Sequence, residues 1–455
     1  MAMHPRRMTA STLAVWMNGE AVGYWSPKKE IFQYHPDWST NPHARALSLS
    51  MPFTPGNAPH KGDVVSNYFD NLLPDSDAIR RRLATKFQTR NTSAGALLEA
   101  VGRDCVGAIQ LLPHDAAPPA FEGIQGVPLT TEDVADILRN TTTSTALNLQ
   151  SVPSKDGLRL SIAGAQEKNA LLYIDDRWFL PVGTTPTTHI LKLPLGLVGN
   201  MKADMSTSVE NEWLCSRIVH AFGIPIAFCK PAIFGTGQGA IKALVVERFD
   251  RAIDNEAGIL LRLPQEDMCQ ALGVNSLAKY EMDGGPTAKD IIDLLRNGIS
   301  PEQDCLNFFK SLLVFWLLAA TDGHAKNFSI KLHKGGSYSL APLYDVLSAH
   351  PLVGKGQNHI PKQKLKLAMA VVSNSKHYLV DNIVARHWVA FGQYLGFPER
   401  QVKTLIHQVY CEVPAVIAQA KNEITSQLNG NFPNGLAQAI FNGMLALRER
   451  LAIDA

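Results

Sequence analysis

Residues 320–348 combine side chains that could carry out phosphoryl transfer from a nucleotide. Asp322 is followed five positions later by Asn327, and Asp345 comes after a segment that reads as a short β-hairpin. In such a reaction one carboxylate orients the attacking hydroxyl, while an amide and a second carboxylate hold Mg²⁺ against the phosphates. Taken alone, the sequence DGHAKN at 322–327 is also typical of a polar turn after a buried helix.

Asp345 favours the phosphoryl-transfer interpretation. It lies in the otherwise apolar sequence LYDV at 343–346, where a carboxylate is costly unless it is paired or bound to a cation. Mg²⁺ and a phosphate would satisfy it. A capped turn after Pro342 is the alternative.

Lys192 is the second candidate, because it lies in the apolar strand-like sequence HILKLP. In a nucleotide site such a lysine would contact the phosphates as a point charge. The alternative is that the strand lies at the edge of its sheet and the lysine side chain extends from it into water. Glu210 and Glu212, on the next predicted helix, are both candidates for its ion-pair partner, as kinase-like sites require.

Two further segments fit a nucleotide site. In SIAGAQEK at 161–168, Gly164 stands between alanines and would allow close approach of the backbone to a phosphate. The segment is not a Walker A motif, and a tight β-turn would have the same sequence pattern. In VERFD at 246–250 a strand ends beside an aromatic residue, which suits adenine but also an ordinary strand exit. His324 is not needed as a metal ligand, since no histidine cluster supports zinc.

The elements around these segments predict an α+β fold with two lobes. A hairpin is expected over residues 12–26, with Asn18-Gly19 as its turn. Strands are expected between 158 and 193 and again before 250, and the chain after 264 reads as mainly helical. The apolar run at 312–320 is about half of the ~20 residues that a membrane span needs, so it predicts a buried helix leading to Asp322.

Composition places the chain among ordinary globular proteins. It has 455 residues, 45% hydrophobic and 18% charged, which indicates two or three domains. The net charge of +2 neither demands nor excludes a nucleic-acid partner. The six cysteines are scattered, and the basic N-terminus lacks an apolar segment of the kind found in signal peptides. We therefore expect free thiols, a cytoplasmic location and no membrane segment.

The order of these motifs resembles the HipA toxin family, the Ser/Thr-kinase component of bacterial HipBA toxin–antitoxin modules. The resemblance covers nearly the whole length. It is carried by FDNLLPDS at 69–76, VGRDCVGA at 101–108, SIAGAQEK at 161–168, TPTTHILKLP at 185–194, VERFDR at 246–251, LRLPQEDMCQ at 261–270 and ATDGHAKNFS at 320–329.

The resemblance implies a two-lobed, protein-kinase-like α+β fold. A β-rich N-terminal subdomain (1–125) would pack on a kinase-like small lobe (126–262). An all-helical C-terminal lobe (263–455) would carry the catalytic and metal-binding segment.

The resemblance also implies an ATP- and Mg²⁺-dependent site. Asp322 would be catalytic, Asn327 and Asp345 would bind the metal ion, and Ser161 would be autophosphorylated, ejecting the phosphate-binding loop. The residues implied to bind ATP are Val106, Ser161, Ala163, Gly164, Lys192, Glu247, Phe249, Gln265, His324 and Lys326.

The partners implied by the family are a HipB-type antitoxin dimer, operator DNA through the antitoxin complex, and glutamyl-tRNA synthetase as the protein substrate. Phosphorylation of that substrate would cause growth arrest and persistence. Two alternatives remain: an ATP-binding co-repressor without kinase activity towards other proteins, and a kinase acting on a small metabolite. A run of lysines could approach operator phosphates, although a solvated face is the favoured interpretation. These are Lys355, Lys362, Lys364, Lys366 and Lys376.

Overall fold

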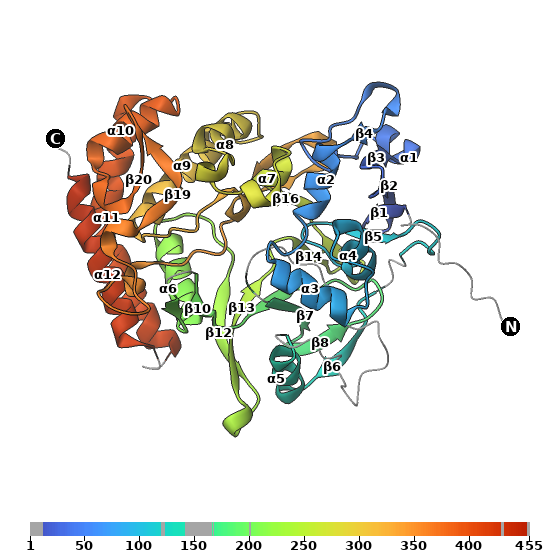
Figure 1. Cartoon of the computed structure of the whole chain (residues 1–455), viewed down its shortest axis with the longest axis horizontal. Coiled ribbons are helices and arrows are strands. Elements are labelled where there is room, and N and C mark those ends of the chain that lie inside the picture. Colours follow the sequence, from blue (N-terminus) through green and yellow to red (C-terminus); the bar gives the residue numbers. More distant parts are fainter. Residues whose placement is uncertain are drawn as a thin grey trace.

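The computed structural model describes residues 12–119, 123–141, 166, 168–199, 202–428 and 432–452. The described residues form three hydrophobic cores: one in the N-terminal domain, one in the sheet of the small lobe, and one that joins helix α6 (Ser208–Ala221) of the small lobe to the large lobe. Figure 1 shows the N-terminal domain and the C-terminal helices at opposite ends of the molecule, with the small lobe between and below them.

The N-terminal domain is built on a five-stranded sheet in the order β4-β3-β2-β1-β5. Its predicted first hairpin is present, and Asn18 and Gly19 form the turn with positive φ angles of 45° and 86°. The rings of Trp25 and Phe69 stack at 3.8 Å between centroids in the core. The strands are β1 Leu13–Met17, β2 Glu20–Ser26, β3 Ile31–Tyr34, β4 His60–Lys61 and β5 Ile109–Pro113. The helices are α1 Pro36–Thr40, α2 Asp63–Asp70, α3 Asp77–Lys86 and α4 Ala94–Val101.

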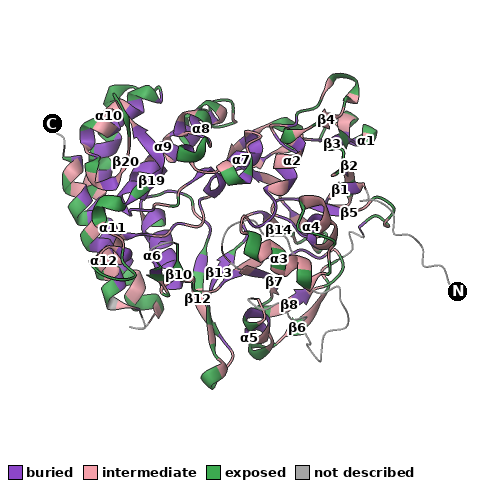
Figure 2. Cartoon of the chain, in the orientation of Figure 1, coloured by how far each residue is buried: buried purple, intermediate pink, exposed green. Residues whose placement is uncertain are grey.

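The small lobe contains a six-stranded sheet in the order β12-β13-β9-β7-β8-β6. Helix α5 packs against it, and α6 is buried over nearly its whole length (Figure 2). Its sheet strands are β6 Gly126–Leu129, β7 Lys168–Ile174, β8 Arg177–Pro181, β9 His189–Lys192, β12 Cys229–Phe234 and β13 Ile241–Glu247. Two hairpins, β10 Gly196–Val198 with β11 Ala203–Met205 and β14 Arg251–Asp254 with β15 Ile259–Arg262, accompany helices α5 Thr131–Arg139 and α6 Ser208–Ala221.

The large lobe ends in helices, but it is not all-helical as the resemblance implied. It also contains a three-stranded sheet, in which β17 and β18 form the short hairpin expected before Asp345, and the β19–β20 hairpin, which was not expected. The strands are β16 Gln265–Asp267, β17 Ser329–Leu332, β18 Tyr338–Leu340, β19 Lys366–Val372 and β20 Lys376–Leu379. The helices are α7 Met268–Ala271, α8 Ala288–Leu295, α9 Pro301–Leu317, α10 Ala385–Tyr394, α11 Glu399–Leu428 and α12 Asn434–Arg448.

The N-terminal domain contacts both lobes, whereas the sequence analysis placed it on the small lobe. On the small-lobe side, Asp104 forms buried ion pairs with three arginines, Arg248, Arg251 and Arg262. On the large-lobe side, the Leu49 amide donates to Glu266 at 2.9 Å, and Asn71 donates to the Val274 carbonyl at 2.9 Å. The boundaries 1–125, 126–262 and 263–455 stay a prediction.

Candidate active site

The segment predicted to carry the catalytic and metal-binding residues, 320–348, begins where α9 ends. This helix is buried along most of its length, as the apolar run predicted. After it the chain turns sharply at Ala319, whose φ of 47° is unusual for a residue with a side chain. The Asn327 side-chain amide then donates to the Asp322 carbonyl at 2.7 Å. This bond closes the loop and leaves the Asp322 side chain 60% exposed.

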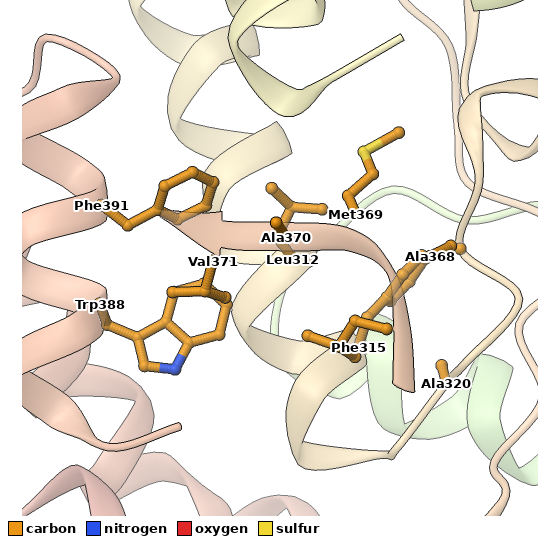
Figure 3. Close-up of a pocket in the computed structure, with 11 residues that line it drawn as sticks. Leu312, Phe315, Ala320, Ala368, Met369, Ala370, Val371, Trp388 and Phe391 are labelled. Atoms are coloured by element: carbon orange, nitrogen blue, oxygen red, sulfur yellow. The ribbon is translucent and has the colours of Figure 1, made fainter. Parts of the chain in front are cut away.

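An apolar pocket lies behind this loop (Figure 3). It is lined by residues of α9, β19 and α10, including Phe315, Trp388 and Phe391, together with Ala320 and Gly323 of the loop itself. A Cβ atom on Gly323 would lie 2.6 Å from the Phe315 ring, so the loop packs too tightly there for any other residue. The pocket lining includes none of the residues predicted to bind ATP.

Lys192 lies at the centre of the charged part of the site. Its ammonium nitrogen is 2.6 Å from Oε1 of Glu212 on α6, and it also donates to Oδ1 of Asp345. The other Asp345 oxygen is 4.0 Å from Nζ of Lys168. Glu210, the other candidate partner, instead pairs with Lys242. The sequence therefore narrowed the partner to two residues, and the structure selects Glu212.

These groups perturb one another's pKa values. Burial would raise the pKa of Asp345, but Lys192 and Lys168 outweigh it and lower that pKa below its usual range. Burial would lower the pKa of Lys192, but Asp345 and Glu212 raise it. Burial, together with the nearby Asp345 carboxylate, raises the pKa of Glu212, because two carboxylates share one lysine. Asp345 is consequently ionised and Lys192 protonated at neutral pH.

The backbone holds Asp345 in an uncommon conformation. Its φ is +59°, in the left-handed region that aspartate visits more readily than most residues. Two residues earlier, the backbone of Leu343 is fixed by two hydrogen bonds. Its amide donates to the Pro225 carbonyl at 2.8 Å, and its carbonyl accepts from the Ala227 amide at 2.8 Å. A strained residue held by its surroundings is typical of functional sites.

Segments that carry three of the predicted ATP-binding residues, Val106, Phe249 and Gln265, meet around Gly107. Gly107, next to Val106, donates from its amide to Asp250 at 2.7 Å, and a Cβ on it would lie 2.7 Å from the Gln265 carbonyl oxygen. Phe249 stacks on Tyr344 with ring centroids 5.9 Å apart, which links this end of the site to Asp345. Glu247 is exposed at the end of β13.

The loop from Asp322 to Asn327, named the catalytic loop for its predicted role, is anchored through Lys326. Its ammonium donates to the Asn71 carbonyl at 3.0 Å and to the Asn71 side-chain oxygen at 2.7 Å. It also lies 3.6 Å from Asp75 and 3.4 Å from Asp267. The structure thus gives Lys326 a bracing role, and its predicted contact with ATP stays a prediction.

Of the remaining predicted residues, the structure describes His324 but not the three in the segment 161–164. His324 is buried beside Asp322, with 3.8 Å between Nε2 and Oδ1, and burial lowers its pKa to about 4. Ser161, Ala163 and Gly164 lie outside the described residues. Sequence reasoning had not assigned roles to three neighbours of the site, Lys168, Tyr280 and Asp75. Lys168 and Asp75 lie in motifs of the family resemblance and Tyr280 lies in none of those given above, but nothing in the local pattern of any of the three indicated that it would reach this site.

The donor set fits Mg²⁺. The side-chain nitrogen of Asn327 donates to the Asp322 carbonyl, which leaves the side-chain oxygen of Asn327 available as a metal ligand. The Asp345 carboxylate supplies a second ligand. Mg²⁺ is commonly held by one or two protein oxygens together with substrate phosphates and water. Within the described ranges no group of three or more His, Cys, Asp or Glu side chains could hold a metal ion, so a closed zinc-type site is not part of that region.

Two observations bear on the predicted partners. Of the five lysines proposed to approach DNA, two are engaged in ion pairs, Lys362 with Asp381 and Lys376 with Glu281, each at 2.9 Å. Across the part of the chain that the structure describes, no helix combines the length and apolar character needed to cross a membrane.

Comparison with known proteins places the chain in a family. A model of the HipA-like C-terminal domain matches residues 160–417, and a model of the HipA N-terminal domain matches residues 13–112. A putative kinase, Y4mE of Sinorhizobium fredii, is 35% identical over 353 residues, covering 75% of this chain and 78% of that protein. The serine/threonine-protein kinase toxin HipA of Shewanella oneidensis is 27% identical over 402 residues, covering 85% and 83%.

A solved structure has the same fold. HipA from Shewanella oneidensis, in a complex with HipB and its operator DNA, superposes with a TM-score of 0.75 over 96% of this chain and 97% of that one, at 24% identity. The fold is therefore the α+β fold of that kinase toxin, with a strand-rich N-terminal region and a helical C-terminal end. From the two family models and its relatives, this chain belongs to the HipA family.

Proposed function

We propose that this protein is the toxin of a toxin–antitoxin module and acts as an ATP- and Mg²⁺-dependent serine/threonine protein kinase. The observation that carries the proposal is the continuous set of contacts from Glu212 through Lys192 to Asp345, facing the loop of Asp322 and Asn327. The hydroxyl of Tyr344, next to Asp345, donates to the Lys326 carbonyl at 2.9 Å and joins the two halves. Two relatives, a putative kinase and a serine/threonine-protein kinase toxin, support the same reaction class.

Each side chain has a part in the reaction. Asp322 orients the attacking hydroxyl and accepts its proton, while Lys192, held by Glu212, neutralises charge on the phosphates. Asn327 and Asp345 would hold Mg²⁺, whose positive charge would stabilise the charge that develops on the transferred group. Most of the rate enhancement would come from positioning and electrostatics.

The hydroxyl that receives the phosphate is proposed to be Ser161 in the same chain and a serine of another protein. The family resemblance supports Ser161 as a site whose phosphorylation inactivates the kinase. It also supports glutamyl-tRNA synthetase as the substrate, with growth arrest and persistence as the outcome. We place the protein in the cytoplasm, where that substrate works.

We further propose a HipB-type antitoxin dimer as partner, with operator DNA bound through that complex. The complex of the similar Shewanella toxin with HipB and operator DNA supports this assignment. The second candidate function is an ATP-binding co-repressor, which would bind the same antitoxin but transfer no phosphate to other proteins. A kinase acting on a small metabolite would keep the reaction but lose the protein substrate.

Asp322→Asn tests the proposal. The variant should lose autophosphorylation and toxicity while still binding ATP, and Asp283→Asn, at an exposed position nearby, should behave as wild type. Phosphopeptide mapping of the wild-type protein should locate phosphate on Ser161. Incubation with labelled ATP and glutamyl-tRNA synthetase, with cell lysate in parallel, separates the protein substrate from a metabolite. Full activity of Asp322→Asn would refute the assignment.

A further inference from the structure

Tyr280 lies directly beside the catalytic carboxylate. Its hydroxyl donates a hydrogen bond to Oδ1 of Asp322. The Asp322 side chain is nevertheless 60% exposed, so one oxygen is held from the protein side while the carboxylate stays open to solvent. A general base needs this arrangement, because it must be fixed in direction and still reach a substrate hydroxyl.

Aromatic and cationic neighbours hold the Tyr280 ring in place. The His324 ring packs edge-on against it, with centroids 4.9 Å apart and an interplanar angle of 85°. The ammonium of Lys279 lies 5.5 Å from the ring centroid and is itself paired with Asp75 at 2.8 Å. Since the pKa of His324 is lowered to about 4 by burial, this histidine contributes packing at neutral pH and adds no charge beside the base.

The backbone around Tyr280 is also fixed. Its carbonyl accepts from the amides of Asp283 and Gly285, each at 3.0 Å. A Cβ on Gly285 would lie 1.9 Å from the Ala278 carbonyl oxygen, so this turn closes too tightly for any residue but glycine. The Ala325 amide donates to the Lys279 carbonyl at 3.2 Å and ties the turn to the catalytic loop.

The hydroxyl of Tyr280 stays protonated and can always donate this hydrogen bond. Burial and the nearby Asp322 carboxylate both raise the pKa of Tyr280 above its ordinary value, so the hydroxyl keeps its proton throughout the physiological range. The hydrogen bond therefore runs in one direction, from Tyr280 to Asp322.

We propose that Tyr280 is a positioning residue that fixes Oδ1 of Asp322, so that Oδ2 faces the substrate hydroxyl. The inference rests on the proposed kinase function and deepens it. The hydroxyl of Tyr280 donates to Asp322, so Tyr280 would act on the reaction through that carboxylate. Its loss should affect the rate of transfer while leaving nucleotide binding intact.

Tyr280→Phe tests this, because it removes only the hydroxyl. With labelled ATP and full-length protein, we expect the maximal rate of autophosphorylation to fall about tenfold, the order of effect for a lost hydrogen bond to a charged group. The ATP concentration at half-maximal rate and the melting temperature should not change. Tyr394→Phe, at a half-exposed tyrosine of α10, is the matched control and should equal wild type.

Three outcomes overturn the inference while leaving the kinase function standing. These are an unchanged rate, a faster rate (which would mean that Tyr280 occupies the place of the substrate hydroxyl), and a slower rate with a matching loss of melting temperature. A second comparison is independent of the first: adding Tyr280→Phe to the inactive Asp322→Asn protein should leave its affinity for ATP unchanged, and a loss of affinity would contradict action through Asp322 alone. If the wild-type protein transfers no phosphate, the proposed function fails and the inference falls with it.

Discussion

Glu210 and Glu212 differ by two positions on one buried helix, yet their carboxylates have different partners. Glu212 bonds the buried Lys192, and Glu210 bonds Lys242, whose side chain is 44% exposed. From the sequence, Lys192 could be singled out as a lysine in an apolar strand, and its partner could be narrowed to these two. The choice between them depends on the rotation of α6 against the sheet, which no local pattern specifies.

At the residue scale, Glu212→Gln should therefore slow phosphoryl transfer by about 10- to 100-fold, the kinetic equivalent of one charge-assisted hydrogen bond. The amide would no longer hold the ammonium group of Lys192 by charge, so that group would lie less firmly at the phosphates. Glu210→Gln, which breaks a partly exposed ion pair, should leave the rate near wild type. Initial rates with labelled ATP measure both, and equal losses in the two variants would contradict the assignment of Glu212.

Asp322, Asn327 and Asp345 could be singled out as candidates from residue type and spacing alone. Lys168 and Tyr280 could not, because each reaches the site from a separate segment and neither is costly in its own local context. Side chains of this kind become part of a site only when the tertiary fold brings them there.

At the scale of elements, helix α2 and the turn after it support the catalytic loop through Lys326. The sequence predicted the first hairpin and the buried helix before Asp322 correctly, since both depend on local signals, namely an Asn-Gly turn and a long apolar run. It did not predict the β19–β20 hairpin, whose strands pair only through a few residues. It also gave no sign that residues 71 and 75 reach the catalytic loop, a contact across more than 250 positions of the chain.

Lys326→Met separates the bracing role from the predicted ATP contact. Removing a buried ammonium group would leave Asp267 without this ion pair and Asp75 with Lys279 alone, at a cost of about 3–5 kcal/mol in the free energy of unfolding. We expect a lower melting temperature together with lower activity, while Lys334→Met, at an exposed lysine, should change neither. Weaker ATP binding at an unchanged melting temperature would instead support the nucleotide contact.

At the scale of the whole molecule, Glu266 is a fully buried carboxyl group where the N-terminal domain meets the large lobe. Oε1 accepts from the Leu49 amide, and burial raises the pKa of Glu266 to about 8. A carboxyl group with a raised folded-state pKa contributes stability that is complete below its unfolded pKa, about 4.3, and is lost as pH rises through 8. The proton on Glu266 therefore favours this interface in acid and neutral conditions.

Glu266→Gln keeps the hydrogen-bond acceptor but cannot ionise. Between pH 6 and pH 9 the wild-type melting temperature should fall further than that of the variant, because only wild type must bury a charge as pH rises. Glu256→Gln, at an exposed position, should follow wild type across the range. Parallel curves for wild type and Glu266→Gln would show that this carboxyl group does not link pH to stability.

The ion pairs of Asp104 with Arg248, Arg251 and Arg262 have a consequence for how such a chain can evolve. Two family models describe the N-terminal and C-terminal parts separately, yet the charges that join them are buried and depend on one another. A substitution in one part alone would leave a buried charge of the other part without its ion-pair partner. The two parts should therefore be inherited as a matched pair, with changes at the junction arising together. A chimaera that joins the first part of one relative to the second part of another should fold only when both come from lineages that share this junction.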